Sequence, residues 1–412
     1  MRSISLSPKV VVQRFVLQIA VGIANGVYAI IKCLPVRNKV TFITWNSNSP
    51  SLDYRILMSR LRQTPKPPKV VALCRELSGG ISAQWRYGFH LLHQMYQLAT
   101  SKVVVLDSYS VLASVLHHRP ELRVVQIWHA LGAFKKFGWS IVDKSEGWSA
   151  QSNIPSRTLA RLLRMHAGYT HAAVSYSGAV PHFAEAFRCQ PNILRVAWLP
   201  RVTFLRDEAA MAKLRAQILS AHPELGQGRV VLYAPTIRRS PGTGAYVDSL
   251  IESLACEDWN LVVKLHPVRG EMDEPTFPDH SVAVPDFSAL ELLAIADAVV
   301  TDYSAIVYEA YLCGVPVYFH AHDINDYTQA CGFYTDPQQF PSKIYPTTDE
   351  LIEGLRLGVY DSAAMERFVE VFVEDSDQRI DILELIDPKA NPEPGLVYDP
   401  FARSPRYQLN PR

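Results

Sequence analysis

Two histidines follow apolar runs of the kind that form buried β-strands. His129 comes directly after Val124–Trp128, and His266 comes directly after Leu261–Leu265. Ligands of open α/β sheets bind at the carboxyl ends of the strands, so we expect the two imidazoles to face each other across a cleft. The unperturbed pKa of an imidazole lies near neutral pH, so either ring could act as a general base toward a hydroxyl group. The alternative for each is a hydrogen-bonded structural histidine.

Basic side chains gather close to the same predicted strand ends. They are Lys135, Lys136, Arg238, Arg239 and Lys264. Cationic groups neutralise phosphate oxygens, and the guanidinium fork matches their geometry. These residues are therefore candidates for binding a pyrophosphate, and a place in a solvated loop is the alternative for each of them.

The stretch Ala298–Val317 predicts a strand, a tight turn, a helix and a second strand. The first apolar run ends at Thr301, Ser304 lies where the helix should begin, and the helical stretch closes on Gly314. A phosphate is favoured at such a helix end by the first N–H groups and by the helix dipole. Glu309 lies about one and a half turns further along, within reach of a ribose if a nucleotide crosses the helix end. A capped helix without any ligand is the alternative.

Composition and missing motifs argue against several classes of function. The 412 residues carry 41 Lys and Arg against 40 Asp and Glu, so the net charge of +1 gives the whole chain no attraction for nucleic acid. The six cysteines are scattered without a C-x-x-C pair, which is typical of a reduced cytosolic protein. No G-x-G-x-x-G, G-x-x-x-x-G-K-[ST] or G-x-S-x-G pattern stands at a strand end, which disfavours dehydrogenase, P-loop and hydrolase functions.

No metal site or cofactor is predicted from the residues. The histidines of His90–His93 and His320–Asp323 lack Cys or His partners at zinc-site spacing. A divalent cation such as Mg²⁺ remains compatible with a phosphate-handling site, but no set of ligands for it stands out.

Short β-rich runs alternate with helical stretches from Lys39 onward, which is typical of parallel sheets with crossover helices. The predicted strands are Val40–Trp45, Val70–Cys74, Val103–Leu106, Val124–Trp128 and Ala172–Val174 in the first half and Val230–Tyr233, Leu261–Leu265, Ala298–Val300 and Val315–Phe319 in the second. A hinge near Trp198–Arg201 would give an α/β fold of two Rossmann-like domains facing a cleft. Helices predicted at 349–358, 363–372 and 376–386 complete the second domain or cross back onto the first. The expected divisions are 1–36, 37–200, 201–386 and a proline-rich tail, 387–412.

The N-terminal segment Val10–Leu34 is largely apolar. Its polar residues Arg14, Gln18, Asn25 and Lys32 fall on one stripe of a helix. This pattern favours a helix that lies in a membrane interface. A spanning helix is compatible with the length of the segment, and packing against the protein itself is the third alternative. No convincing cleavage site follows, which argues against a secretory signal.

An ordered series of motifs resembles the CDP-glycerol glycerophosphotransferase family, which comprises teichoic acid primases and polymerases with their ribitol-phosphate relatives. The motifs are His129…Lys135-Lys136-Phe137-Gly138, Leu199-Pro200-Arg201, Leu232-Tyr233-Ala234-Pro235-Thr236…Arg238, Lys264-Leu265-His266-Pro267, Thr301-Asp302-Tyr303-Ser304, Gly332-Phe333-Tyr334 and Asp375…Arg379-Ile380. They cover about residues 39–386. The resemblance implies a glycosyltransferase-B architecture, with an acceptor domain followed by a CDP-donor domain, at the cytoplasmic face of the cell membrane.

The resemblance also implies an activity and roles for residues. The family transfers a polyol phosphate from CDP-glycerol or another CDP-polyol to a lipid-linked polyprenyl-pyrophosphate acceptor and releases CMP. His129 and His266 fall on the family's essential histidines. The residues implied near the donor phosphates are Thr301, Asp302, Ser304 and Arg379.

The sequence departs from the family's usual motifs in a few places. Ala130–Ala133 follows the first histidine where Gly-Thr-Pro is usual, and Thr203 stands where Asp is common. The run Glu309–Val317 is closer to the E-A-x-x-x-G-x-P-V of nucleotide-sugar glycosyltransferases. A sugar transferase of the same fold and a non-catalytic, membrane-associated nucleotide-binding subunit are therefore the two alternative functions.

Overall fold

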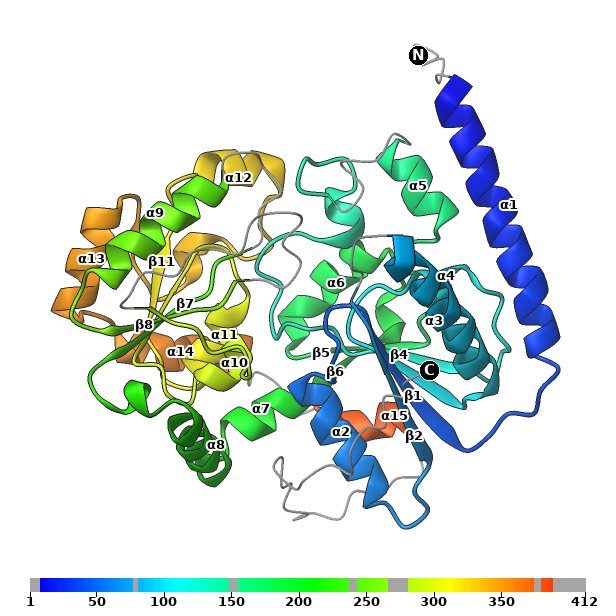
Figure 1. Cartoon of the computed structure of the whole chain (residues 1–412), viewed down its shortest axis with the longest axis horizontal. Coiled ribbons are helices and arrows are strands. Elements are labelled where there is room, and N and C mark those ends of the chain that lie inside the picture. The colour runs from blue at the N-terminus through cyan, green and yellow to red at the C-terminus, as the bar shows by residue number, and fades with distance from the viewer. Residues whose placement is uncertain are drawn as a thin grey trace.

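Two parallel β-sheets, each covered by helices, make up the computed structural model of the chain (Figure 1). The structure describes residues 8–76, 81–147, 155–236, 243–265, 281–373 and 379–387. The first sheet runs, in spatial order, β13 (Ile380–Asp381), β6 (Leu194–Trp198), β5 (His171–Val174), β4 (Arg123–Gln126), β3 (Val103–Leu106), β1 (Lys39–Thr44) and β2 (Lys69–Cys74). The second runs β12 (Ile344–Tyr345), β11 (Val317–His320), β10 (Ala298–Thr301), β7 (Val230–Tyr233), β8 (Asn260–Val263) and β9 (Ser281–Val282). The expected pair of α/β domains is confirmed.

The central strands are short runs of apolar residues because helices cover both faces of each sheet. Every residue of β3, β7 and β10 is buried. All strand runs predicted from the sequence are present with ends shifted by at most a few residues. The short strands β9, β12 and β13, and also β6, were not predicted, because runs this brief carry little periodicity.

The helices alternate with the strands along the chain. Those of the first domain are α1 (Pro8–Ile31), α2 (Leu52–Arg62), α3 (Ile81–Thr100), α4 (Val111–Val115), α5 (Ser156–Leu162) and α6 (Val180–Phe187). Those that follow are α7 (Pro200–Leu205), α8 (Glu208–Ala221), α9 (Thr243–Ala255), α10 (Ala289–Leu292), α11 (Ile306–Leu312), α12 (Ile324–Ala330), α13 (Thr348–Leu357), α14 (Ser362–Phe372) and α15 (Ile382–Ile386).

The chain returns to the first domain near its end. Strand β13 pairs with β6 at the edge of the first sheet, and α15 packs beside β4. Arg60 of α2 forms an ion pair with Asp381, and Arg123 donates to the Leu385 carbonyl at 3.0 Å. The sequence allowed the last helices to cross back onto the first domain, and residues 380–386 do so, although the expected division at 386 grouped them with the second. Among the described residues of the helix predicted over 376–386, Ile380–Asp381 form β13 and the helix α15 begins at Ile382.

Helix α1 packs along α3 and α5 and contributes apolar side chains to the core of the first domain, and its first turns extend beyond the domain (Figure 1). Tyr28 is 1% exposed, and its hydroxyl lies 2.8 Å from His118 Nδ1. Asn25 donates to the Val115 carbonyl at 3.1 Å, and Lys32 Nζ donates to the His117 carbonyl. Part of the polar stripe thus faces the protein. The helix is long and apolar enough to cross a membrane. Only 6% of its most apolar 18-residue segment is buried inside the protein.

Candidate active site

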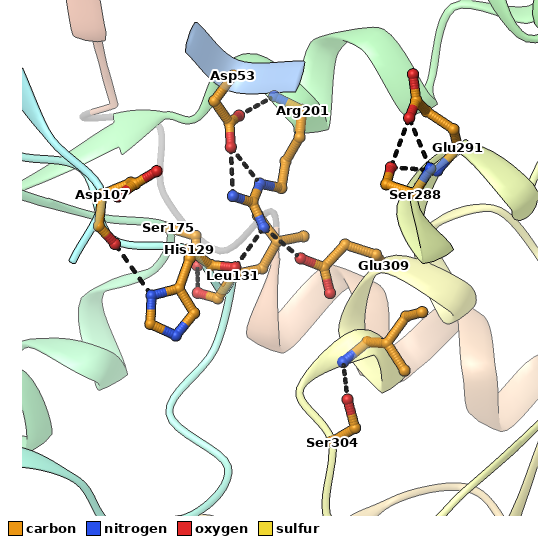
Figure 2. Close-up of polar contacts among 11 residues, drawn as sticks. Asp53, Asp107, His129, Leu131, Ser175, Arg201, Ser288, Glu291, Ser304 and Glu309 are labelled. Atoms are coloured by element: carbon orange, nitrogen blue, oxygen red, sulfur yellow. Dashed lines mark hydrogen bonds and ion pairs between the residues drawn. The ribbon is translucent and has the colours of Figure 1, made fainter. Parts of the chain in front are cut away.

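His129 lies immediately beyond the carboxyl end of β4 with an exposed side chain. The preceding Trp128 adopts a left-handed backbone with φ 58°, and its N–H donates to the Gln126 side chain at 2.9 Å, which stabilises this sharp turn. His129 Nδ1 lies 3.0 Å from the Asp107 carbonyl oxygen (Figure 2). Because a carbonyl can only accept, Nδ1 carries the proton and Nε2 is the basic atom. This tautomer is the one that a general base requires.

Asp107, whose backbone carbonyl holds the His129 ring, has a buried carboxyl group. It follows β3, it is 5% exposed, and Ser108 donates to its carboxyl at 3.0 Å. Burial raises the pKa of the Asp107 carboxyl to about 7, against the opposing effect of hydrogen bonds from Thr44 and Ser108. The residue that orients His129 through its backbone therefore carries an acid that changes its charge near neutral pH.

Arg201, at the start of α7, joins the two domains next to His129 (Figure 2). Its guanidinium pairs with Asp53 of α2, and its Nη1 donates to Glu309 of α11 at 2.9 Å. The same Nη1 donates to the His129 carbonyl at 2.8 Å. All three charged side chains are buried, and burial opposes the charge of Arg201 while Asp53 and Glu309 raise its pKa above the usual value. One arginine thus ties the backbone of the candidate base to both halves of the molecule.

Glu309 lies where a ribose contact was predicted, but Arg201 already occupies one of its oxygens. The side chain is 3% exposed, and burial raises the pKa of its carboxyl above the usual value, against the pull of Arg201. Its Oε2 atom is buried, and none of the described residues donates a hydrogen bond to it. A ribose contact through this oxygen stays a prediction.

The turn after β10 is stabilised by its own polar side chains. Thr301 is fully buried and donates to the Ala234 carbonyl at 2.7 Å, while Asp302 accepts from the backbone N–H groups of Thr236 and Tyr303. A phosphate contact through the Thr301 hydroxyl would require breaking this bond.

Helix α11 begins at Ile306, two residues later than the position of Ser304 predicts, and its N-cap residue is Ala305. The Ser304 hydroxyl still accepts from the Ile306 N–H at 3.4 Å (Figure 2). Ser304 is half-buried and lies at the carboxyl end of the second sheet, as expected for a residue near a donor.

The loop after His129 is fixed against the second domain. Lys136 N–H donates to the Gly332 carbonyl at 2.9 Å, and the Lys136 ammonium lies 5.7 Å from the centre of the Tyr334 ring. Lys135 forms a β-bridge with Phe333. A Cβ atom at residue 132 would lie 2.1 Å from the Tyr308 ring, so only Gly132 allows this close approach. Both lysines therefore lie at the boundary between the domains.

The remaining candidates are distributed more widely. Lys264 donates to the Val284 carbonyl at 2.8 Å, and burial lowers the pKa of its ammonium below the usual value. Arg379, at the start of β13, stacks over Trp198 with 4.4 Å to the ring centre. His266, Arg238 and Arg239 lie outside the described residues. In the described part of the chain, no group of three His, Cys, Asp or Glu side chains is placed to hold a metal ion.

Comparisons with known proteins identify the family of the chain. The model of the family described as CDP-Glycerol:Poly(glycerophosphate) glycerophosphotransferase matches residues 27–380. The chain belongs to this family. It is 30% identical to the teichoic acid ribitol-phosphate primase of Bacillus spizizenii over 374 residues, which are 88% of this chain and 94% of the primase. It is 31% identical to the ribitol-phosphate polymerase TarL of Staphylococcus aureus, of which it covers 50%.

The glycerophosphotransferase family also supplies a solved structure with the same fold. A histidine variant of the wall teichoic acid polymerase TagF superposes with a TM-score of 0.66 at 15% sequence identity, over 89% of this chain and 94% of the TagF chain. The likeness confirms the expected two-domain architecture of the glycosyltransferase-B type.

The sequence of this glycerophosphotransferase-family chain predicts the candidate base, His129, but not the residues that position it. Asp53 lies in the first turn of α2, and Asp107 follows β3. Arg201 was noticed within a motif, but no role was predicted for it. A carboxylate directly after a buried strand run is a usable signal in the sequence, and Asp107 meets it. Asp53 offers no such signal, because its role depends on a contact with a distant helix.

Proposed function

We propose that the chain transfers glycerol phosphate or ribitol phosphate from a CDP-polyol to a hydroxyl group of a lipid-linked acceptor and releases CMP. The observation that carries the proposal is the position of His129, with its basic nitrogen fixed by Asp107, inside a chain that matches the glycerophosphotransferase family over residues 27–380. The 30% identity to a ribitol-phosphate primase over 94% of its length supports ribitol phosphate as one of the two candidate groups.

The proposed reaction begins with the acceptor hydroxyl at His129. Nε2 takes the hydroxyl proton as the oxygen forms a bond to the β-phosphorus of the donor. The bond between that phosphorus and the oxygen bridging to the CMP phosphate breaks in line, and CMP leaves with the bridging oxygen. Backbone N–H groups and cationic side chains at the carboxyl ends of the second sheet stabilise the charge that develops on the phosphoryl oxygens.

The proposed location is the cytoplasmic face of the cell membrane. Exposed apolar side chains of α1, among them Phe15 at 62% and Ile23 at 62%, support attachment to a bilayer surface. A surface-bound enzyme meets a lipid-linked acceptor at a higher effective concentration than a freely diffusing one.

The test measures CMP release by the purified protein on vesicles that carry the acceptor, with CDP-glycerol, CDP-ribitol and nucleotide sugars as separate donors. His129→Ala should lower kcat by about 10²–10⁴-fold while donor affinity stays near wild type, because a positioned base acts on the chemical step. His117→Ala, which changes an exposed histidine of the first domain, is the control. A folded His129→Ala protein that retains more than about a tenth of wild-type turnover would refute the role of the base. Release of nucleotide from a nucleotide sugar alone would support the sugar transferase instead.

A further inference from the structure

A cavity of about 360 Å³ lies in the first domain, on the other side of Trp128 from the candidate base. We call it the arginine pocket. Its polar and charged lining consists of Trp139, Arg161, Arg164, His166, Tyr169 and Arg188. Its volume is within the range of small-molecule sites in proteins.

No described residue neutralises the positive charge of the arginine pocket. No Asp or Glu occurs among its described lining residues, and the three guanidinium groups have no hydrogen-bond or ion-pair partner in the described part of the chain. Arg188 instead stacks over Trp139, 4.9 Å from the ring centre. Burial, with a smaller contribution from His129, lowers the pKa of His166 to about 3, so this histidine is neutral. Three guanidinium forks around one cavity suit an anion with several phosphate oxygens.

The backbone around the arginine pocket is held in an uncommon conformation. Arg164, His166 and Arg188 have φ of 48°, 57° and 52°, the left-handed region that residues other than glycine seldom adopt. Trp139 Nε1 donates to the Met165 carbonyl at 2.9 Å, and the Tyr109 hydroxyl donates to the Leu163 carbonyl at 2.7 Å. These bonds hold the arginine-bearing turn in place, so the shape of the pocket does not depend on a ligand.

The pocket lies on the side of the domain that carries α1. Helix α5, which ends beside Arg164, packs against α1 (Figure 1). Arg164 also lies close enough to help depress the pKa of His118, which is lowered mainly by burial, and His118 contacts Tyr28 of α1. If α1 lies on a bilayer with its exposed apolar face, the arginine pocket is near the lipid headgroups.

The pocket also lies close to the candidate base. The His166 ring, in the pocket wall, contacts the Trp128 ring edge-on with centres 5.9 Å apart. The Trp128 ring packs against His129 with centres 4.3 Å apart. A phosphate bound in the pocket is therefore separated from His129 by the rings of His166 and Trp128, a distance that the headgroup attached to that phosphate would have to span to reach the base.

We propose that the arginine pocket binds the diphosphate of the lipid-linked acceptor and so directs the acceptor hydroxyl to His129. The proposal rests on the proposed function, which requires a lipid-linked acceptor. A diphosphate fits three guanidinium groups better than the single phosphate of an ordinary anionic lipid, and the closeness to His129 favours the substrate over a bulk lipid.

The test compares Arg164→Gln, Arg188→Gln and the double variant with wild type. Glutamine keeps a polar side chain at each position and removes the charge. For a polyprenyl-diphosphate acceptor in vesicles, each single change should raise the acceptor KM by about tenfold, because a charge-assisted hydrogen bond is lost. For a water-soluble acceptor analogue without the diphosphate, the rise should be much smaller. Arg62→Gln, which changes an exposed arginine of α2 that does not line the pocket, is the matched control.

A second measurement identifies the source of the phosphate. Wild type and the double variant are floated with neutral vesicles that contain either polyprenyl diphosphate or phosphatidylglycerol at equal charge. The proposal expects the variant to lose binding to the diphosphate vesicles selectively. Equal losses on both kinds of vesicle would overturn it in favour of a general headgroup site, and equal losses of turnover on both acceptors would indicate a structural defect and also overturn it. If wild type turned over no CDP-polyol, the proposed function would fail. The flotation result would still show whether the arginine pocket binds a lipid diphosphate.

Discussion

Asp107 is a carboxylic acid in an environment that disfavours its charge. It is almost completely buried and its pKa is raised to about 7 by burial. A carboxyl group whose pKa is higher in the folded protein than in the unfolded chain binds its proton more tightly when folded. Its contribution to stability is therefore fully present at low pH and is lost as the pH rises through about 7.

We expect Asp107→Asn to stabilise the protein at alkaline pH. At pH 8 the substitution removes a buried negative charge, so the free energy of unfolding should rise by about 1–3 kcal/mol. At pH 5 the native carboxyl is protonated and only part of the stability loss has developed, since the loss begins when the carboxyl of the unfolded chain ionises, so the gain should be smaller than at pH 8. Urea denaturation at both pH values measures this, with Asp326→Asn, an exposed carboxyl of α12, as the control. A gain of the same size at both pH values would contradict the raised pKa.

The residues of the site differ in how far the sequence could predict them. His129 was found because a buried strand run ends there, and the chain direction alone then places it at the ligand-binding edge of the sheet. Asp53 and Arg201 lie 148 positions apart, and their pairing exists only after α2 and α7 have packed together. Local patterns contain no information about such a contact. The same holds for Glu309, because its ion pair with Arg201 joins two helices that are far apart in the chain.

At the scale of elements, the apolar composition of the N-terminal segment predicts α1. It does not predict which face of this helix packs against the protein. The polar residues Asn25 and Lys32 were expected to line a solvated stripe, yet both bond to carbonyl groups of the first domain. Large apolar side chains of α1 face outward instead, namely Val11, Val12, Phe15, Val16, Ile19, Ile23 and Ile30. The face of α1 that docks on the first domain therefore combines these polar contacts with packed apolar side chains such as Val21 and Val27, and the other apolar side chains are left for a bilayer.

Replacing Phe15, Ile19 and Ile23 together by serine should release the protein from vesicles. Each large apolar side chain contributes up to about 1.5–3 kcal/mol when it is fully removed from water, so the partition coefficient should fall by at least about tenfold. Val371→Ser, on the exposed face of α14, removes a comparable exposed apolar side chain and should have no effect. Sedimentation with vesicles gives the bound fraction. Unaltered binding of the triple variant would place the membrane contact elsewhere.

At the scale of the whole molecule, the two domains share an apolar core and ionic contacts. The largest core cluster includes residues of both sheets, such as Phe42 and Leu232. Arg201, between Asp53 and Glu309, is the fully buried charged element among the described contacts, and Arg55 of α2 also pairs with Glu291 of α10 at 2.6 Å. The alternation of strands and helices predicted two sheets, whereas the return of β13 to the first sheet depends on a pairing between strands far apart in the chain.

Arg201→Gln should destabilise the molecule and impair the reaction for separate reasons. The substitution leaves two buried carboxylates without their cation, which costs about 3–5 kcal/mol and should lower Tm by about 10 °C. Adding Glu309→Gln removes one of these charges, so the double variant should recover part of the lost Tm, a coupling that a double-mutant cycle measures. The His129 carbonyl has still lost its guanidinium donor, so kcat should stay low in the double variant. Recovery of kcat in parallel with Tm would mean that Arg201 acts on stability alone, and additive effects on Tm would mean that the three charges do not form one unit.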